Sequence, residues 1–262
     1  MTEAVANSLA NLKFAFRYRR KPLSVPHCKM CYSDNEVASF LALDRDSLME
    51  PDLHPILWDG YVCWGTWSQV AYYIPRMLEL FADDHIVETD RMFMLMLYPI
   101  RPETGFWIGD PVQDCDIDAD EVEAVAEFVG EAVLAHIAEE RRQDSVWWMT
   151  EPMSFLGALS IPIGPLLDRM ATNDDVRVRA NFGLFLAECV IGYQQPLGAW
   201  KVKPEPTPDN RAAMDHWLTP SILAAYLLDH SADFEVFGKD AASTALLAFD
   251  WAAAQMQGTS GA

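Results

Sequence analysis

The residues with the clearest capacity for chemistry are two cysteines and a histidine near the start of the chain. His27, Cys28 and Cys31 lie in the stretch PHCKMCYSDNE. A Cys-x-x-Cys turn can direct two thiolates at one ion, and the adjacent imidazole can add a nitrogen, so these three residues are candidate zinc ligands. Structural zinc usually takes four ligands, and the chain has no second Cys-x-x-Cys turn. Further ligands would come from scattered residues such as Cys63, His54 or His85.

The same cysteine pair has two other interpretations. Thiol-disulfide chemistry needs the first cysteine at a helix N-terminus that follows a strand, and no strand pattern precedes Cys28. The pair can also pack the turn before a helix, and the sequence favours this role over a metal site. No cofactor is therefore expected, with zinc as the alternative. Burial as small apolar side chains is expected for Cys63, Cys115 and Cys189.

A long run of acids is the second suggestive feature. Between Arg101 and Arg141 the chain has twelve acidic residues and no Lys or Arg. Like charges four residues apart oppose a helix, so their retention favours either solubility or a landing site for a basic protein. The candidate partner-binding residues are Asp114, Asp116, Asp118, Asp120, Glu121, Glu123, Glu127 and Glu131.

The stretch DCDIDADE, at residues 114–121, resembles a calcium loop only in the alternation of its carboxylates. Its sixth position is Ala119 in place of glycine, and its twelfth is Val125 in place of a bidentate glutamate. The acids are instead expected at the N-terminal end of a long helix, where the helix dipole favours negative charge.

The overall charge disfavours several classes of partner. Lys and Arg number 19 against 39 Asp and Glu, for a formal net charge of -20. Such a field repels phosphate backbones and anionic lipid, so we expect neither nucleic acid nor membrane as a partner.

Five cysteines over 262 residues suit reduced thiols in a cytoplasmic protein. The chain lacks a phosphate loop, a His-Glu-x-x-His motif and a Gly-x-Ser-x-Gly elbow, so an enzyme is not expected.

Helix signals position these groups. Capping patterns occur at SDNE (33–36) and TWSQ (66–69), and Thr219 precedes a proline suited to a first helical position. Apolar residues recur every three or four positions over 117–137 and near 245–256, and they surround most of the segment 176–193. Pro75 is expected to kink the helix that starts at Thr66 or to divide it after Tyr73. No strand alternation is seen, so we predict an all-α fold, an irregular stack of antiparallel helix pairs that forms a helical globule or a short solenoid-like array.

The expected organisation is a single helical domain over 1–262. Within it we expect a basic N-terminal lead segment at 1–25, a Pro-rich internal loop at 200–210 and a flexible C-terminal tail at 257–262.

Several motifs resemble a group of uncharacterised bacterial helical proteins. These are CKMC before a capped helix, YVCWGTWSQVAYYIPRMLELFA, MDHWLTPSILAAYLL and STALLAFDWAA. The match runs in order from about Cys28 to Met256, although Gly65 here precedes Thr66 and Trp67 where the group has Thr-Trp-Gly. The resemblance implies one continuous helical domain and says nothing about activity.

Three functions follow from these features. The leading hypothesis is an acidic cytoplasmic binding protein that neutralises a basic protein, as an immunity or antitoxin-like inhibitor neutralises a cognate toxin. The first alternative is a metal-dependent or helical-bundle enzyme that uses the Cys28 and Cys31 region with the aromatic cluster at 61–73. The second is a passive helical scaffold. The oligomeric state does not follow from the sequence.

Overall fold

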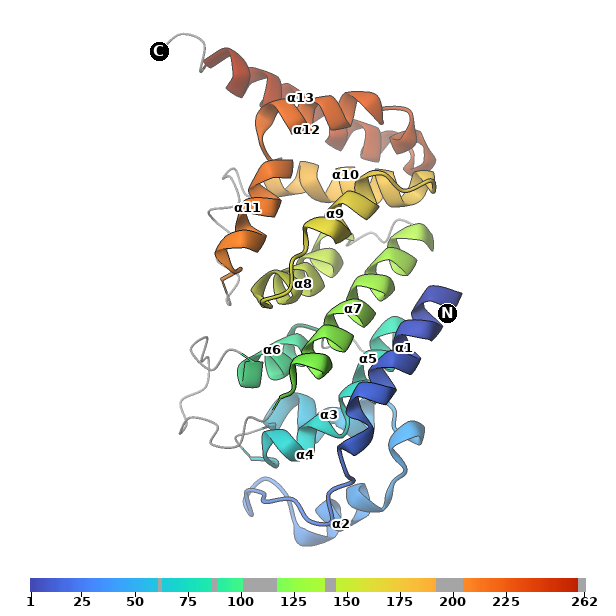
Figure 1. The fold of residues 1–262 in the computed structure, drawn as a ribbon, viewed down its shortest axis with the longest axis vertical. Coiled ribbons are helices and arrows are strands. Elements are labelled where there is room, and N and C mark those ends of the chain that lie inside the picture. Colours follow the sequence, from blue (N-terminus) through green and yellow to red (C-terminus); the bar gives the residue numbers. More distant parts are fainter. Residues whose placement is uncertain (61–62, 86–88, 101–116, 140–144, 192–204, 259–262) are drawn as a thin grey trace. The chain divides into compact units, whose positions relative to one another are not determined.

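A computed structural model describes the chain except for residues 61–62, 86–88, 101–116, 140–144, 192–204 and 259–262 (Figure 1). The α-helices are α1 (Glu3–Ala15), α2 (Asp34–Ala42), α3 (Glu50–Asp59), α4 (Trp67–Ala71), α5 (Ile74–Ala82), α6 (Thr89–Ile100), α7 (Ala119–Glu139), α8 (Ser145–Ala158), α9 (Gly164–Ala171), α10 (Val176–Ile191), α11 (Pro208–Trp217), α12 (Pro220–Asp229) and α13 (Lys239–Gly258). Short 3-10 helices are η1 (Phe16–Tyr18), η2 (Arg45–Ser47) and η5 (Asp233–Phe237). The described residues contain no β-strand, which confirms the all-α prediction.

The chain groups into two compact units, an N-terminal unit (Met1–Ala132) and a C-terminal unit (Val133–Ala262). Helix α7 begins in the first and ends in the second. The prediction of a single domain over 1–262 stays a prediction. Among the helices that the structure describes, none is both long and apolar enough to cross a membrane.

Local capping signals predicted several helix starts correctly. The Ser33 Oγ accepts the Glu36 amide at 3.3 Å, and the Glu36 carboxylate accepts the Ser33 amide at 2.7 Å, which completes the capping box of α2. At α4 the Gln69 side chain accepts the Thr66 amide at 2.9 Å. Pro75 lies in the first turn of α5, separate from α4, as its missing amide donor requires.

Three segments whose bounds are expected from composition are described wholly or in part by the structure. The lead segment 1–25 contains α1 and η1, and its apolar side chains Val5, Leu12 and Phe16 are buried. In the Pro-rich segment, residues 205–207 are irregular, but 208–210 form the first turn of α11, because proline is well suited to a helix start. Residues 257–258 still belong to α13, and the rest of the expected tail and loop lies outside the described residues.

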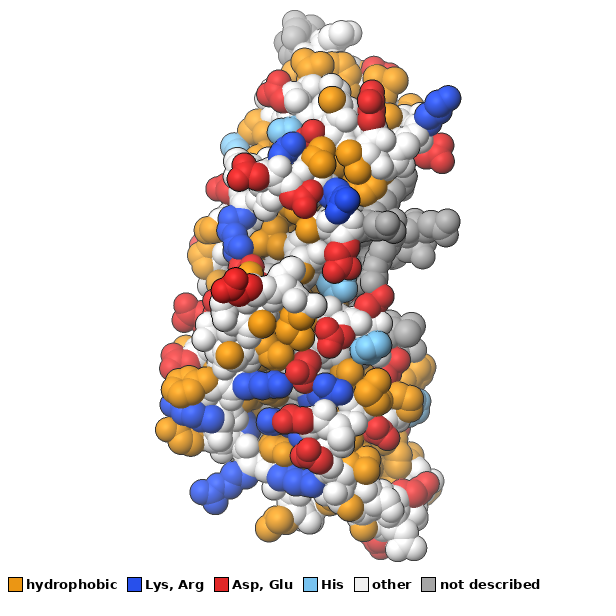
Figure 2. Space-filling model, turned by 90° about the vertical axis from the view of Figure 1, so that its right-hand side faces the viewer, with side chains coloured by type: hydrophobic (Ala, Val, Ile, Leu, Met, Phe, Trp, Pro, Cys, Tyr) orange, Lys and Arg blue, Asp and Glu red, His pale blue; other side chains and the backbone are white. Residues whose placement is uncertain are grey.

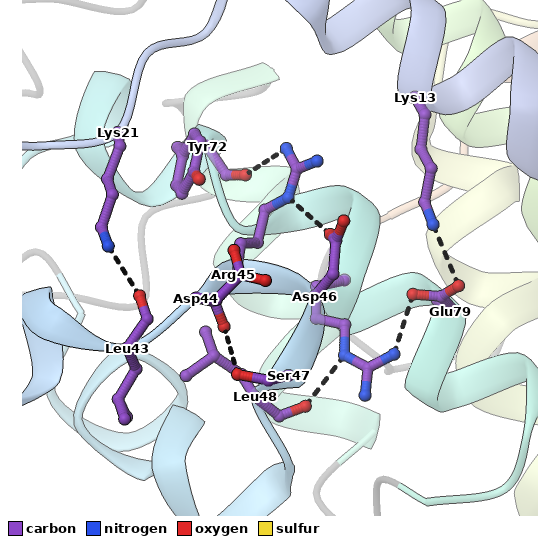
Figure 3. A network of polar contacts seen from close by, with 11 residues as sticks. Lys13, Lys21, Leu43, Asp44, Arg45, Asp46, Ser47, Leu48, Tyr72 and Glu79 are labelled. Carbon is purple, nitrogen blue, oxygen red and sulfur yellow. Dashed lines mark hydrogen bonds and ion pairs between the residues drawn. The ribbon is translucent and has the colours of Figure 1, made fainter.

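The N-terminal unit packs α1 against α5 and α3 against α5 and α6. Polar contacts also join elements of this unit (Figure 3). Lys13 on α1 reaches the Glu79 carboxylate on α5 at 3.0 Å, and Arg76 donates to the same carboxylate at 2.8 Å. Nearby, the Arg45 guanidinium contacts the Tyr72 carbonyl at 3.4 Å. These contacts connect η2 and α1 to the segment that follows α4.

The C-terminal unit is built around α10, which packs against α8, α9, α12 and α13. Buried residues occur around its whole circumference, as the apolar pattern predicted. Gly183 lets α10 pack closely against η5, since an added Cβ would lie 2.7 Å from the Phe234 ring. The buried Asn210 of α11 accepts the Ile163 amide at 3.0 Å and donates to carbonyls of the segment between α8 and α9.

Candidate metal centre

Three cysteine thiols converge in the N-terminal unit. The sulfur atoms of Cys28, Cys31 and Cys63 all lie within 4.8 Å of one another, and those of Cys31 and Cys63 are 3.5 Å apart. All three residues are free thiols in the structure. Cys31 is exposed and the other two are half-buried, so the cluster lies at the surface of the unit. The structure thus brings two candidate ligands together with a residue 32 positions further along the chain.

A short backbone pairing produces this convergence. The Cys28 amide donates to the Cys63 carbonyl at 2.9 Å, and the Gly65 amide donates to the Pro26 carbonyl at 2.8 Å. His27 and Trp64 form an antiparallel β-bridge between these bonds. Gly65 has φ of +74°, a conformation that glycine adopts without steric cost. The pairing aligns the first cysteine with the third.

Two helix ends hold the paired segments. After Cys28, the Cys31 and Tyr32 amides both donate to the Cys28 carbonyl, at 3.0 and 2.9 Å, which closes a tight turn immediately before α2. On the other side, the Cys63 and Trp64 amides donate to the Asp59 carbonyl at the end of α3, at 2.8 and 3.1 Å. Each cysteine segment is therefore attached to a helix terminus.

Aromatic side chains pack beside the cysteine segments. Trp64 is buried and meets the rings of Tyr32 and Phe40 edge-to-face, with centroids 5.0 and 5.1 Å apart. The Tyr32 hydroxyl donates to the Asp59 carboxylate. Burial and this neighbouring carboxylate raise the pKa of Tyr32. Of the aromatic cluster expected at 61–73, the described side chains of Trp64, Trp67 and Tyr73 are buried, as core packing requires.

His27 lies beside the sulfur cluster without joining it. Its Nδ1 lies 2.9 Å from the Val25 carbonyl oxygen, an acceptor, so Nδ1 carries the proton. Its Nε2 lies 3.3 Å from the Asp34 carboxylate. No ligand group that includes His27, His54 or His85 is found among the described residues. Cys63, which the sequence offered as a possible further ligand, is the residue that joins Cys28 and Cys31, because the β-bridge that holds His27 places the next residue, Cys28, opposite Cys63.

The pKa values of two of the thiols, Cys28 and Cys31, are shifted in opposite directions. Hydrogen bonds from the Met30 and Cys31 backbone amides lower the pKa of the Cys28 thiol. Hydrogen bonds to the sulfurs of Cys63 and Cys28 raise the pKa of Cys31 to about 12. Of these two thiols, Cys28 is the one whose thiolate form is favoured, and a bound cation would balance the charge of further thiolates.

The acidic candidates differ in their exposure. Asp118, Asp120, Glu123 and Glu127 are exposed, and Glu131 is half-buried. Asp114 and Asp116 lie outside the described residues.

Glu121 is buried, with 2% exposure, and accepts two hydrogen bonds from the Arg19 guanidinium at 2.7 and 2.6 Å. It also accepts the Asp118 amide at 3.1 Å, in the first turn of α7. Glu121 is thus held inside the N-terminal unit, because Arg19 of the lead segment neutralises it there. This placement differs from the partner-binding role expected from the sequence.

The distribution of charged side chains over the surface is relevant to the hypothesis of a landing site for a basic protein. Figure 2 shows a face on which acidic, basic and apolar side chains are interspersed, with no continuous acidic field.

Comparison of the chain with protein-family models, with curated proteins and with solved structures finds no match in any of the three. The resemblance described above consequently rests on its motifs alone.

Proposed function

We propose that the N-terminal unit binds one zinc ion through Cys28, Cys31 and Cys63. The observation that supports this proposal is the convergence of the three sulfur atoms within 4.8 Å. Zinc–sulfur bonds of about 2.3 Å at tetrahedral angles place sulfurs about 3.8 Å apart, so small side-chain adjustments suffice to hold the ion. Thiolates are soft ligands that select zinc or Cu(I) over magnesium and calcium.

The bound ion would join two segments that are distant in sequence. It links the turn that precedes α2 to the turn that follows α3, in which the buried Trp64 directly follows Cys63. The described contacts between these turns are mainly a few backbone hydrogen bonds and ring contacts. A metal that binds only the folded arrangement stabilises it by mass action. The proposed role of zinc is therefore to hold the cysteine segments in place.

Metal analysis of the purified full-length protein tests this proposal. About one equivalent of zinc is expected after dialysis against trace zinc, with loss of most of it in the separate variants Cys28→Ser, Cys31→Ser and Cys63→Ser. Cys189→Ala is the matched control, because Cys189 is a buried thiol of the C-terminal unit. His27→Ala should retain the metal. Stoichiometric copper in place of zinc, or zinc that survives Cys63→Ser, would contradict the proposal.

A second candidate function is favoured by the excess of acids. We propose that the exposed carboxylates on α7 and just before it attract a basic protein, which the chain then inhibits as an immunity or antitoxin-like protein does. Complementary charge speeds encounter and is weakened by salt. The exposed acids that support the proposal are Asp118, Asp120, Glu123 and Glu127.

Charge reversal at two positions tests this second proposal. A basic partner would first be purified by affinity from cells that encode this protein and identified by mass spectrometry. Glu123→Lys with Glu127→Lys should slow its association several-fold at low salt. Asp229→Lys with Asp240→Lys is the matched control, since both residues are exposed in the C-terminal unit and the net charge changes equally. Equal effects of the two pairs would refute a landing site on α7.

A further inference from the structure

The three-cysteine cluster leaves one position of a tetrahedral zinc ion without a ligand. Among the residues that the structure describes, no histidine, aspartate or glutamate joins the group formed by Cys28, Cys31 and Cys63. Structural zinc is normally enclosed by four protein ligands, whereas a site with three protein ligands keeps an exchangeable position. With three converging side chains instead of four, this site differs from a closed structural zinc site.

Two carboxylates of the segments that carry the cysteines are already held by other partners. The Asp59 carboxylate accepts the Tyr32 hydroxyl. The Asp34 carboxylate pairs with the Lys29 ammonium and lies 3.3 Å from the His27 ring. Lys29 lowers the pKa of Asp34, so this carboxylate is already stabilised as an anion where it lies. Recruitment of either acid to the metal would break these contacts.

The site is also open to an incoming ligand. Cys31 is exposed, and Met30, which lies between the two cysteines of the turn, is 94% exposed. Carboxylate and phosphate oxygens are hard ligands, whereas a zinc ion held by thiolates favours a further soft ligand. A soft sulfur ligand matches both the metal and the apolar side chain beside it.

From these observations we propose that the zinc centre at Cys28, Cys31 and Cys63 binds a small-molecule thiol at its fourth position. This inference rests on the proposed zinc site. On binding, the thiol gives its S–H proton to solvent, its sulfur forms a bond to zinc, and the water that occupied the position leaves. No electron is transferred, and the ligand is held as a thiolate, the nucleophilic form of sulfur.

Cobalt substitution of the full-length protein tests the inference. The protein would be purified with a phosphine reductant, because a thiol reductant would itself fill the open position. Addition of cysteine should raise the sulfur-to-cobalt charge-transfer absorbance by about one third, as three thiolate ligands become four. S-methylcysteine, which has the same carbon skeleton and no ionisable thiol, should leave it unchanged.

Four outcomes would overturn the inference while the metal site itself stands. The first is cobalt bound at one equivalent with absorbance that cysteine does not change. The second is a spectrum that His27→Ala alters before any thiol is added, which would make the imidazole the fourth ligand. The third is a four-thiolate spectrum without added thiol that Cys115→Ser reduces. The fourth is a charge-transfer absorbance per bound cobalt that rises with protein concentration in the absence of thiol, which would show that a second copy supplies the sulfur. Failure to bind cobalt or zinc at all would instead contradict the proposed function.

Discussion

Zinc removal should loosen the pairing between the two cysteine segments far more than the rest of the protein. A metal bridge between Cys31 and Cys63 closes a loop across 32 sequence positions. In the chain-entropy relation for a cross-link, closing a loop of this length lowers the entropy of the open chain by about 12 cal per mol per K. Removal of the metal bridge would therefore favour opening by roughly 500-fold. This figure is an upper limit, because an opened segment that keeps one metal–sulfur bond gains less freedom.

Hydrogen exchange followed by mass spectrometry measures this opening. The Cys28 and Gly65 amides form the two backbone bonds of the pairing, so peptides that contain them report on it directly. Chelation of zinc should accelerate their exchange by a factor between about 10 and about 500. The His230 amide, bonded to the Tyr226 carbonyl in the C-terminal unit, serves as the internal control.

Two results would refute this reasoning. Acceleration of less than about threefold at both paired amides would show that hydrogen bonds and ring packing already hold the segments without metal. Equal acceleration at the control amide would show that chelation acts on the protein as a whole. In Cys63→Ser the zinc dependence should disappear.

Further predictions concern the C-terminal unit and are measurable by urea unfolding. Asn210→Ala should cost about 2–4 kcal/mol, because the buried side chain accepts one amide and donates to backbone carbonyls that would lose their partners; a cost under about 1 kcal/mol would contradict this. Gly183→Ala should cost about 1–3 kcal/mol through its collision with Phe234, and it would fail as a prediction if stability rose. Burial favours a higher pKa for Asp233, but the Arg179 guanidinium at 2.8 Å reverses this and lowers it. This ion pair should therefore contribute stability above about pH 4 that is lost as pH falls further, and Asp233→Asn should remove that part of the acid sensitivity.

Most helix positions follow from local sequence, because their signals act within one or two turns. The Ser33 capping box, the break at Pro75 and the apolar circumference of α10 each depend on residues a few positions apart. Such patterns specify where a helix begins, where it stops and which side is buried. The all-α class follows from them without knowledge of any tertiary contact.

Which residues the charged and sulfur-containing side chains contact could be learned only from the tertiary structure. Nothing near Glu121 indicated that Arg19, 102 positions away, would bury it as an ion pair, so its charge alone suggested an exposed acid. Likewise the Cys-x-x-Cys spacing identified two thiols, and adjacency in sequence suggested His27 as the third ligand, with Cys63, His54 and His85 as scattered candidates for a further one. The β-bridge to Trp64 brings Cys63 to the cluster instead, because backbone pairing decides which distant residues become neighbours, and a single sequence carries no local signal for that choice.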